Sequence, residues 1–111
     1  MKKYKLLFIF IFLLNNCAGI NKFEKETCKQ IHGLFTKATS CLELKFININ
    51  PKKYKEYEKT HNLILKALAD QVYENKINNV QVWEIYDDII LGFKKTKKKQ
   101  DYLITVLSKY N

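Results

Sequence analysis

Three acidic residues are the best candidates for catalysis in this chain of 111 residues. Glu84, Asp87 and Asp88 are spaced by three and four positions, which places Glu84 near both aspartates on one side of a helix. Two carboxylates at a suitable separation hydrolyse glycosidic bonds by acid–base chemistry. The same spacing is typical of a solvated helix face whose acids interact favourably with the helix dipole. The acidic set therefore leaves a periplasmic, cell-wall-acting hydrolase as the alternative to a protein without catalytic activity.

Other catalytic and metal-binding patterns are missing from the sequence. It contains no Gly-rich phosphate loop, no Gly-x-Ser-x-Gly and no His-Glu-x-x-His. His32 follows Cys28 by four positions, but two ligands on one helical face are a weak metal signal. The only other histidine, His61, falls on the apolar face of a predicted helix, where a core histidine with one hydrogen bond is the common case. We expect no enzyme activity, no metal and no cofactor.

The N-terminus has the pattern of an export signal. Residues 1–5 (MKKYK) carry three lysines, and residues 6–14 (LLFIFIFLL) are nine apolar residues in a row. A helix of that length covers about 14 Å, whereas the hydrocarbon core of a bilayer is about 30 Å thick. The segment is therefore too short to span a membrane, and residues 1–16 are expected to be a signal peptide.

The residues after the apolar run indicate lipid attachment. The segment Leu14-Asn15-Asn16-Cys17 resembles the lipobox of bacterial lipoproteins, in which a Leu stands three residues before the modified Cys. The resemblance covers residues 1–19. It implies that Cys17 becomes the first mature residue and carries the lipids, palmitate among them, with residues 17–22 as a short tether. The position before the Cys, which is usually Gly, Ala or Ser, is Asn16 here. Ordinary cleavage after Ala18 or Gly19 is the competing interpretation.

Two cysteines remain if Cys17 takes the lipid. Cys28 and Cys41 then form an even pair in an exported domain, with Gly33 between them to reverse the chain. Closing a loop of this size stabilises a fold by about 3 kcal/mol in the chain-entropy model. The sequence therefore predicts a Cys28–Cys41 disulfide.

All 20 basic residues are lysines, and the net charge is +9. Arginine, the better donor for forked contacts to bases and phosphates, is absent, so we expect no nucleic-acid partner. A charge run of this kind is usually a solvated surface, but it is also attracted to an anionic membrane face. The candidate membrane- or partner-binding residues are Lys94, Lys95, Lys97, Lys98 and Lys99.

Residues typical of helix N-termini occur at two places and predict two helices. Asn50 and Pro51 suit the cap and first position of a helix over about residues 51–76. Asn78 and Gln81 have the spacing of a capping box at the start of the next helix. Two helices joined by a short turn pack antiparallel.

The rest of the chain is less regular. Residues 22–32 are compatible with a helix, residues 42–49 alternate like an extended segment, and a break is expected near residues 94–98. A last apolar stripe follows, formed by Leu103, Val106, Leu107 and Tyr110. Together these patterns predict an all-α domain over residues 23–111, a small three- or four-helix bundle.

These features predict a small exported, lipid-anchored envelope protein that acts by binding a protein or a membrane. Accessory, exclusion and immunity-type factors are the roles that fit this class. Ala18 after the Cys, instead of the Asp that retains many lipoproteins at the inner membrane, favours the periplasmic side of the outer membrane. A soluble periplasmic or secreted protein is the alternative.

The lipid anchor is testable by mass spectrometry. The N-terminal peptide of the protein purified from membranes should begin at Cys17 and carry acyl chains. Treatment with globomycin, which blocks lipoprotein signal cleavage, should leave residues 1–16 attached. A mature N-terminus at Gly19 or Ile20 without lipid would instead show ordinary secretion.

Overall fold

The computed structural model describes residues 20–111. The predicted signal peptide, Cys17 and the first part of the tether lie outside the described residues. The first helix of the described range, α2, begins at Ile20, inside the predicted tether 17–22. Within the described range there is no strand. The elements are α2 (Ile20–His32), α3 (Phe35–Ile49), α4 (Pro51–Tyr54), the 3₁₀ turn η1 (Lys55–Tyr57), α5 (Glu58–Tyr73), α6 (Asn79–Lys95) and α7 (Lys99–Tyr110).

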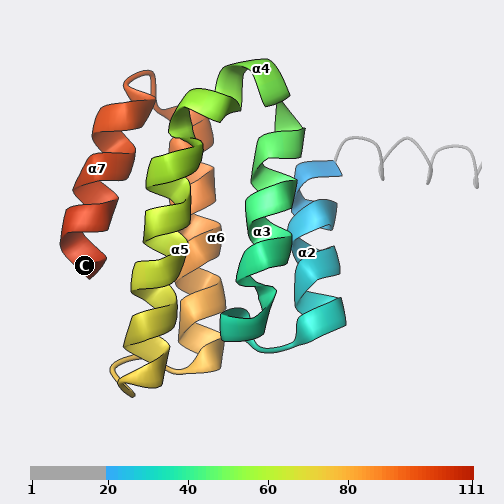
Figure 1. Ribbon diagram of the computed structural model, residues 1–111, viewed down its shortest axis with the longest axis vertical. Coiled ribbons are helices and arrows are strands. Elements are labelled where there is room, and N and C mark those ends of the chain that lie inside the picture. Colours follow the sequence, from blue (N-terminus) through green and yellow to red (C-terminus); the bar gives the residue numbers. More distant parts are fainter. Residues whose placement is uncertain (1–19) are drawn as a thin grey trace, which may run out of the picture.

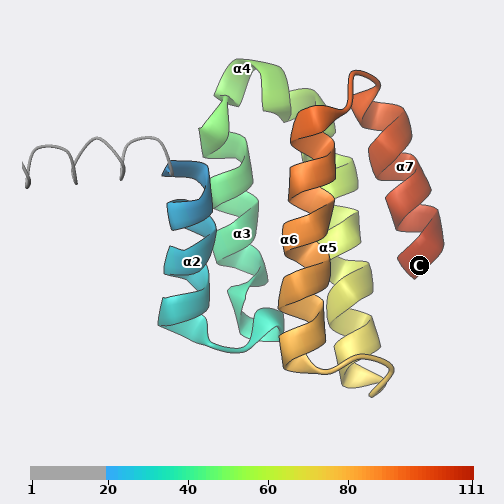
Figure 2. The same cartoon turned by 180° about the vertical axis from the view of Figure 1, so that it is seen from behind.

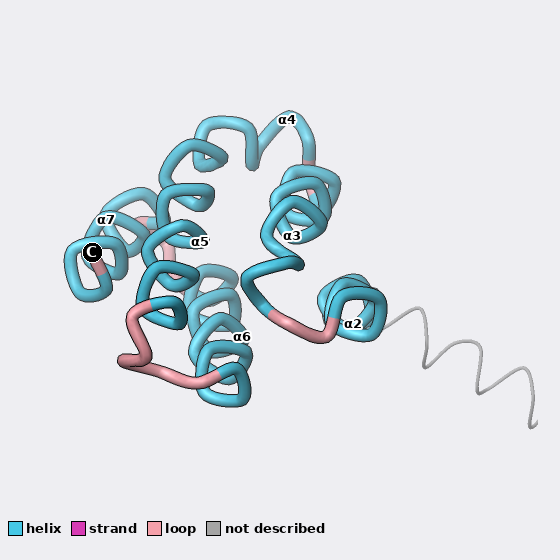
Figure 3. The backbone as a smooth tube through the Cα atoms, turned by 60° about the horizontal axis from the view of Figure 1, so that its bottom comes forward, coloured by secondary structure: helices cyan, strands magenta, loops and turns pink. Residues whose placement is uncertain are grey.

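The helices form a bundle with α5 and α6 at its centre (Figure 1). Helix α3 packs against both of them, α2 covers the outer side of α3, and α7 packs on the opposite flank (Figure 2). Figure 3 shows the same order from the end of the bundle. The all-α prediction is confirmed. The predicted number of three or four helices is wrong, because residues 20–49 form two full helices and residues 20–111 contain five main helices.

The extended segment predicted at 42–49 is wrong, because these residues belong to α3. In a strand, Leu42, Leu44 and Phe46 would share one face. In the helix, Leu42 and Phe46 are four positions apart and both buried, whereas Leu44 is 64% exposed. Alternation in so short a run did not distinguish the two conformations, and packing against α5 and α6 selects the helix.

The predicted long helix 51–76 begins where expected but is not continuous. Asn50 caps it by accepting a hydrogen bond from the Lys53 amide at 3.2 Å. The chain then tightens into η1, and a 3₁₀ turn brings side chains three positions apart onto one line. As a result Tyr54 and Tyr57 both pack edge-on against Phe93, with ring centroids 5.1 and 5.4 Å away.

The connection between α5 and α6 is closed by backbone and side-chain caps. Asn75 has a positive φ of 61° after the end of α5, and the amides of Asn75 and Lys76 donate to the Val72 and Gln71 carbonyls. The capping box predicted for α6 is confirmed. The Asn78 amide donates to Gln81 Oε1 at 2.9 Å, and the Gln81 amide donates to Asn78 Oδ1 at 2.8 Å.

The bundle interior is filled mainly by α3, α5 and α6. Aromatic rings are prominent in it, and Phe46 contacts both His61 and Phe93. Helix α7 contributes a single fully buried side chain, Leu103. The other large buried residues are Phe35, Leu42, Tyr54, Ile64, Leu65, Leu68, Val82, Trp83, Tyr86 and Ile89.

Helix α7 approaches α6 closely at Gly92. The chain breaks between Lys95 and Lys99, as predicted, and α7 then runs back along α5 and α6. Tyr102 lies over Gly92 and donates from its hydroxyl to the Ile89 carbonyl at 3.0 Å. A Cβ atom on Gly92 would meet the Tyr102 ring.

The variant Gly92→Ala should therefore destabilise the protein. A Gly-to-Ala change inside a helix ordinarily stabilises it by about 0.5–1 kcal/mol. Here we expect the opposite sign, a loss of about 1–3 kcal/mol in the free energy of unfolding by urea, because the new methyl group overpacks the α6–α7 contact. Adding Tyr102→Leu should recover part of the loss, and a stabilised Gly92→Ala variant would contradict this packing.

Candidate interaction surfaces

The acidic set lies on α6, largely in contact with solvent. Glu84 and Asp88 are exposed, and Asp87 is half-buried. A general acid at neutral pH needs surroundings that disfavour its ionised form, such as a shielded apolar pocket. Exposure to water gives Glu84 and Asp88 no such shielding. Their positions suit a solvated helix face.

His61 occupies the centre of the bundle. Its side chain is 1% exposed and stacks on the Phe46 ring with centroids 3.8 Å apart. Its Nδ1 lies 3.2 Å from Asn62 Oδ1, which is an acceptor, so Nδ1 carries the hydrogen. Nε2 is then free to accept the hydrogen bond of 2.8 Å from the buried Tyr86 hydroxyl. Both ring nitrogens are satisfied, which is the arrangement of a core histidine.

The surroundings keep this pair uncharged. Burial lowers the pKa of His61 to about 4 and raises the pKa of Tyr86. A neutral histidine stacked on Phe46 and edge-on to Tyr86 joins α3, α5 and α6 without burying a charge. Among residues 20–111 there is also no group of three or more His, Cys, Asp and Glu side chains that could hold a metal ion.

Cys28 and Cys41 lie at disulfide-bonding distance, as the sequence predicted. Their Cα atoms are 5.8 Å apart, and the bond joins α2 to α3. Helix α2 packs chiefly against α3, so this covalent link holds it to its main neighbour. The segment between the two cysteines contains the sharp turn at Gly33, which has a φ of 68°.

A cluster of hydrogen bonds clamps that turn to the start of α6. The Gly33 carbonyl accepts hydrogen bonds from Asn79 Nδ2 and from Trp83 Nε1, each at 3.1 Å. The Phe35 amide donates to Asn79 Oδ1 at 2.9 Å, which also satisfies a donor at the start of α3. Asn79 and Trp83 therefore position the turn from a helix more than forty residues away in sequence.

Exposed apolar residues lie close in the chain to Gly33 and Asn79, which form these hydrogen bonds. Ile31 and Leu34 flank Gly33 and are 68% and 47% exposed, and Val80, next to Asn79, is 67% exposed. We call these three residues the turn patch. A hollow of about 390 Å³, lined by the α5–α6 connection and by Asn79, lies on the same side. The sequence showed Ile31, Leu34 and Val80 only as apolar positions on different segments, and the fold brings those segments together.

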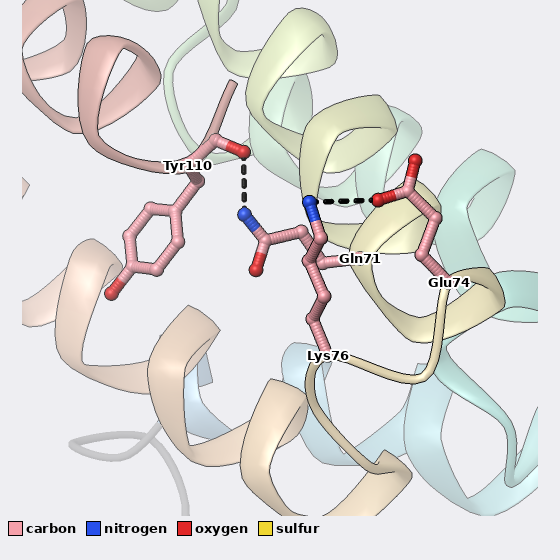
Figure 4. Close-up of polar contacts among 4 residues, drawn as sticks. All are labelled: Gln71, Glu74, Lys76 and Tyr110. Carbon is pink, nitrogen blue, oxygen red and sulfur yellow. Dashed lines mark hydrogen bonds and ion pairs between the residues drawn. The ribbon is translucent and has the colours of Figure 1, made fainter.

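A second, polar hollow lies between the end of α5 and the end of the chain. Gln71 Nε2 donates to the Tyr110 carbonyl at 2.7 Å, and Lys76 forms an ion pair of 3.0 Å with Glu74 (Figure 4). The hollow encloses about 160 Å³. Four of its lining residues are paired by these two contacts, and the Gln71 contact ties the last turn of α7 to α5.

The lysine run at 94–99 divides into two kinds of residue. Lys99 Nζ donates to the carbonyls of Phe93 and Thr96 at 2.6 and 2.9 Å, so it neutralises the partial negative charge at the end of α6. Lys95, Lys97 and Lys98 are exposed. Lys94 is half-buried on the last turn of α6. Of the five candidate residues, Lys99 thus has a structural role, which the sequence analysis missed.

No protein-family model, curated protein or solved structure matches this chain. None of the helices between Ile20 and Tyr110 combines the length and the apolar character needed to cross a membrane.

The buried histidine makes stability depend on pH. The pKa of His61 is about 4 in the folded state and about 6.5 in the unfolded state, so the unfolded chain binds more protons between these values. The free energy of unfolding should therefore fall by about 3 kcal/mol as the pH decreases from 6.5 to 4. Urea titrations across this range measure the effect. His61→Gln should abolish this contribution, whereas changing the exposed His32 to Gln should preserve it.

Proposed function

We propose that this protein is a small exported lipoprotein of the cell envelope, anchored through Cys17, that acts by binding another envelope protein. The N-terminal segment supports the anchor, because a charged start, a short apolar run and a Cys at the lipobox position occur together. Ala18 supports the outer membrane, with the domain on the periplasmic side. The turn patch supports binding.

The rigidity of the turn patch carries the proposal. The turn beside Ile31 and Leu34 is closed by a disulfide on one side and by three hydrogen bonds to α6 on the other. Apolar side chains on a preorganised surface lose less conformational entropy when a partner binds. Exposed apolar residues on a fixed scaffold are also characteristic of the centre of a protein interface.

The patch is placed well for a partner outside the membrane. Helix α2 starts at one end of the bundle, and the α2–α3 turn and the start of α6, which carry the turn patch, lie at the other, as both side views show (Figures 1 and 2). The thirteen residues of α2 span about 20 Å. An anchor just before α2 would hold that end at the lipid surface, and the turn patch would face the periplasm.

Site-specific photocrosslinking tests the binding surface. Benzoylphenylalanine at Leu34 or at Val80 should yield the same single adduct in intact cells. Leu44, equally apolar and 64% exposed on α3, is the matched control position and should yield none. Adding Ile31→Gln should remove the adduct, because it takes away part of the apolar contact. Adducts at all three positions, or at none, would contradict a partner at the turn patch.

A further inference from the structure

Two lysine-containing connections meet at the end of the bundle opposite the turn patch. One is the break between α6 and α7, with exposed Lys95, Lys97 and Lys98. The other is the bend between α3 and α5 (Figures 1 and 2). Its exposed lysines are Lys52, Lys53 and Lys55. We call these six residues the lysine end.

Aromatic packing brings these two connections together. Tyr54 and Tyr57 of the α3–α5 bend hold Phe93 between them, and Phe93 lies on the last turns of α6. Lys99 reaches back over the Phe93 ring at 4.8 Å and fixes the course of the α6–α7 connection. The lysine end is thus built on a packed aromatic core and not on two independent loops.

The charge at this end is strongly positive. Its exposed acidic neighbours in the same segments are Glu56 and Asp101, against six exposed lysines. The partial negative charge of the α6 carboxyl end is already neutralised by Lys99. Such a surface attracts an anionic bilayer, and each lysine near the surface strengthens binding about fivefold at moderate salt.

The chain also enters the domain at this end. Helix α2 begins at Ile20 at the same end of the bundle as both connections, on the flank opposite α7 (Figure 2). Only Ala18 and Gly19 separate Ile20 from Cys17, a reach of about 10 Å. A lipid on Cys17 would therefore hold the lysine end within contact distance of the headgroups.

We propose that the lysine end docks on an anionic phospholipid surface and sets the orientation of the domain, with the turn patch pointing away from the membrane. This inference rests on the proposed lipid anchor at Cys17. It adds that the domain lies against the membrane through six lysines from two connections and does not swing freely on its tether.

Amine footprinting of the processed protein tests the contact. The protein is reconstituted in vesicles of phosphatidylcholine or of an equal mixture with phosphatidylglycerol, and lysine acetylation is followed by mass spectrometry. The six lysines should react severalfold more slowly in the anionic vesicles, and high salt should restore their rates. Exposed lysines elsewhere (Lys37, Lys66 and Lys76) should react equally in both. Equal rates for all lysines in protein that stays in the vesicles would overturn the docking surface.

Two triple variants test whether the connections act as one face. Changing Lys52, Lys53 and Lys55 to Gln should also weaken the protection of the three lysines of the α6–α7 connection. The matched variant Lys37→Gln, Lys66→Gln and Lys76→Gln should leave that protection unchanged. Unaltered protection in the first variant would show that the connections do not share a face. Absence of the proposed lipid anchor would be recognised independently, because mass spectrometry would then find an N-terminal peptide without acyl chains.

Discussion

The stack of Phe46 on His61 is the contact on which the rest of this bundle depends. It joins α3 to α5, and the hydrogen bond from Tyr86 to the same imidazole adds α6. A charged histidine is costly at this position, since burial among aromatic rings disfavours the imidazolium. In the helical α3, Leu42 and Phe46 face the core together, while Leu44, which would share their face in a strand, is left exposed.

The two ends of the bundle are held together by different contacts. At one end, Asn79 and Trp83 of α6 hold the α2–α3 turn, and the disulfide keeps α2 on α3. At the other end, Phe93 gathers the α3–α5 bend and the α6–α7 connection around itself, with Lys99 closing the end of α6. The first end carries the exposed apolar side chains of the turn patch, and the second carries the six exposed lysines of the lysine end. The two ends of the bundle therefore differ in surface chemistry.

This difference between the two ends supports the proposal of a tethered binding protein. A cationic end favours an anionic surface, and a rigid apolar patch favours a protein partner. On α6, Glu84 and Asp88 are exposed and Asp87 is half-buried, and in the core both ring nitrogens of His61 have hydrogen-bond partners. The turn patch and the lysine end are the surfaces on which the proposals of protein and membrane binding rest.

Local signals in the sequence were sufficient for the helical class, the capping box at Asn78 and Gln81, the break after Lys95 and the pairing of Cys28 with Cys41. The first three depend on residues close together in the chain, whose types limit the backbone directly, whereas the cysteine pairing followed from the number of cysteines left once Cys17 was assigned to the lipid. The tertiary structure decided the conformation of 42–49, because alternating apolar residues suit a strand or a buried helix until a neighbour selects one face. It also decided which lysines are free and which one caps a helix, and it assembled the turn patch and the lysine end. Those features join segments tens of residues apart. Hydrogen bonds from Asn79 and Trp83 bring the segments of the turn patch together, and packing around Phe93 does so for the lysine end.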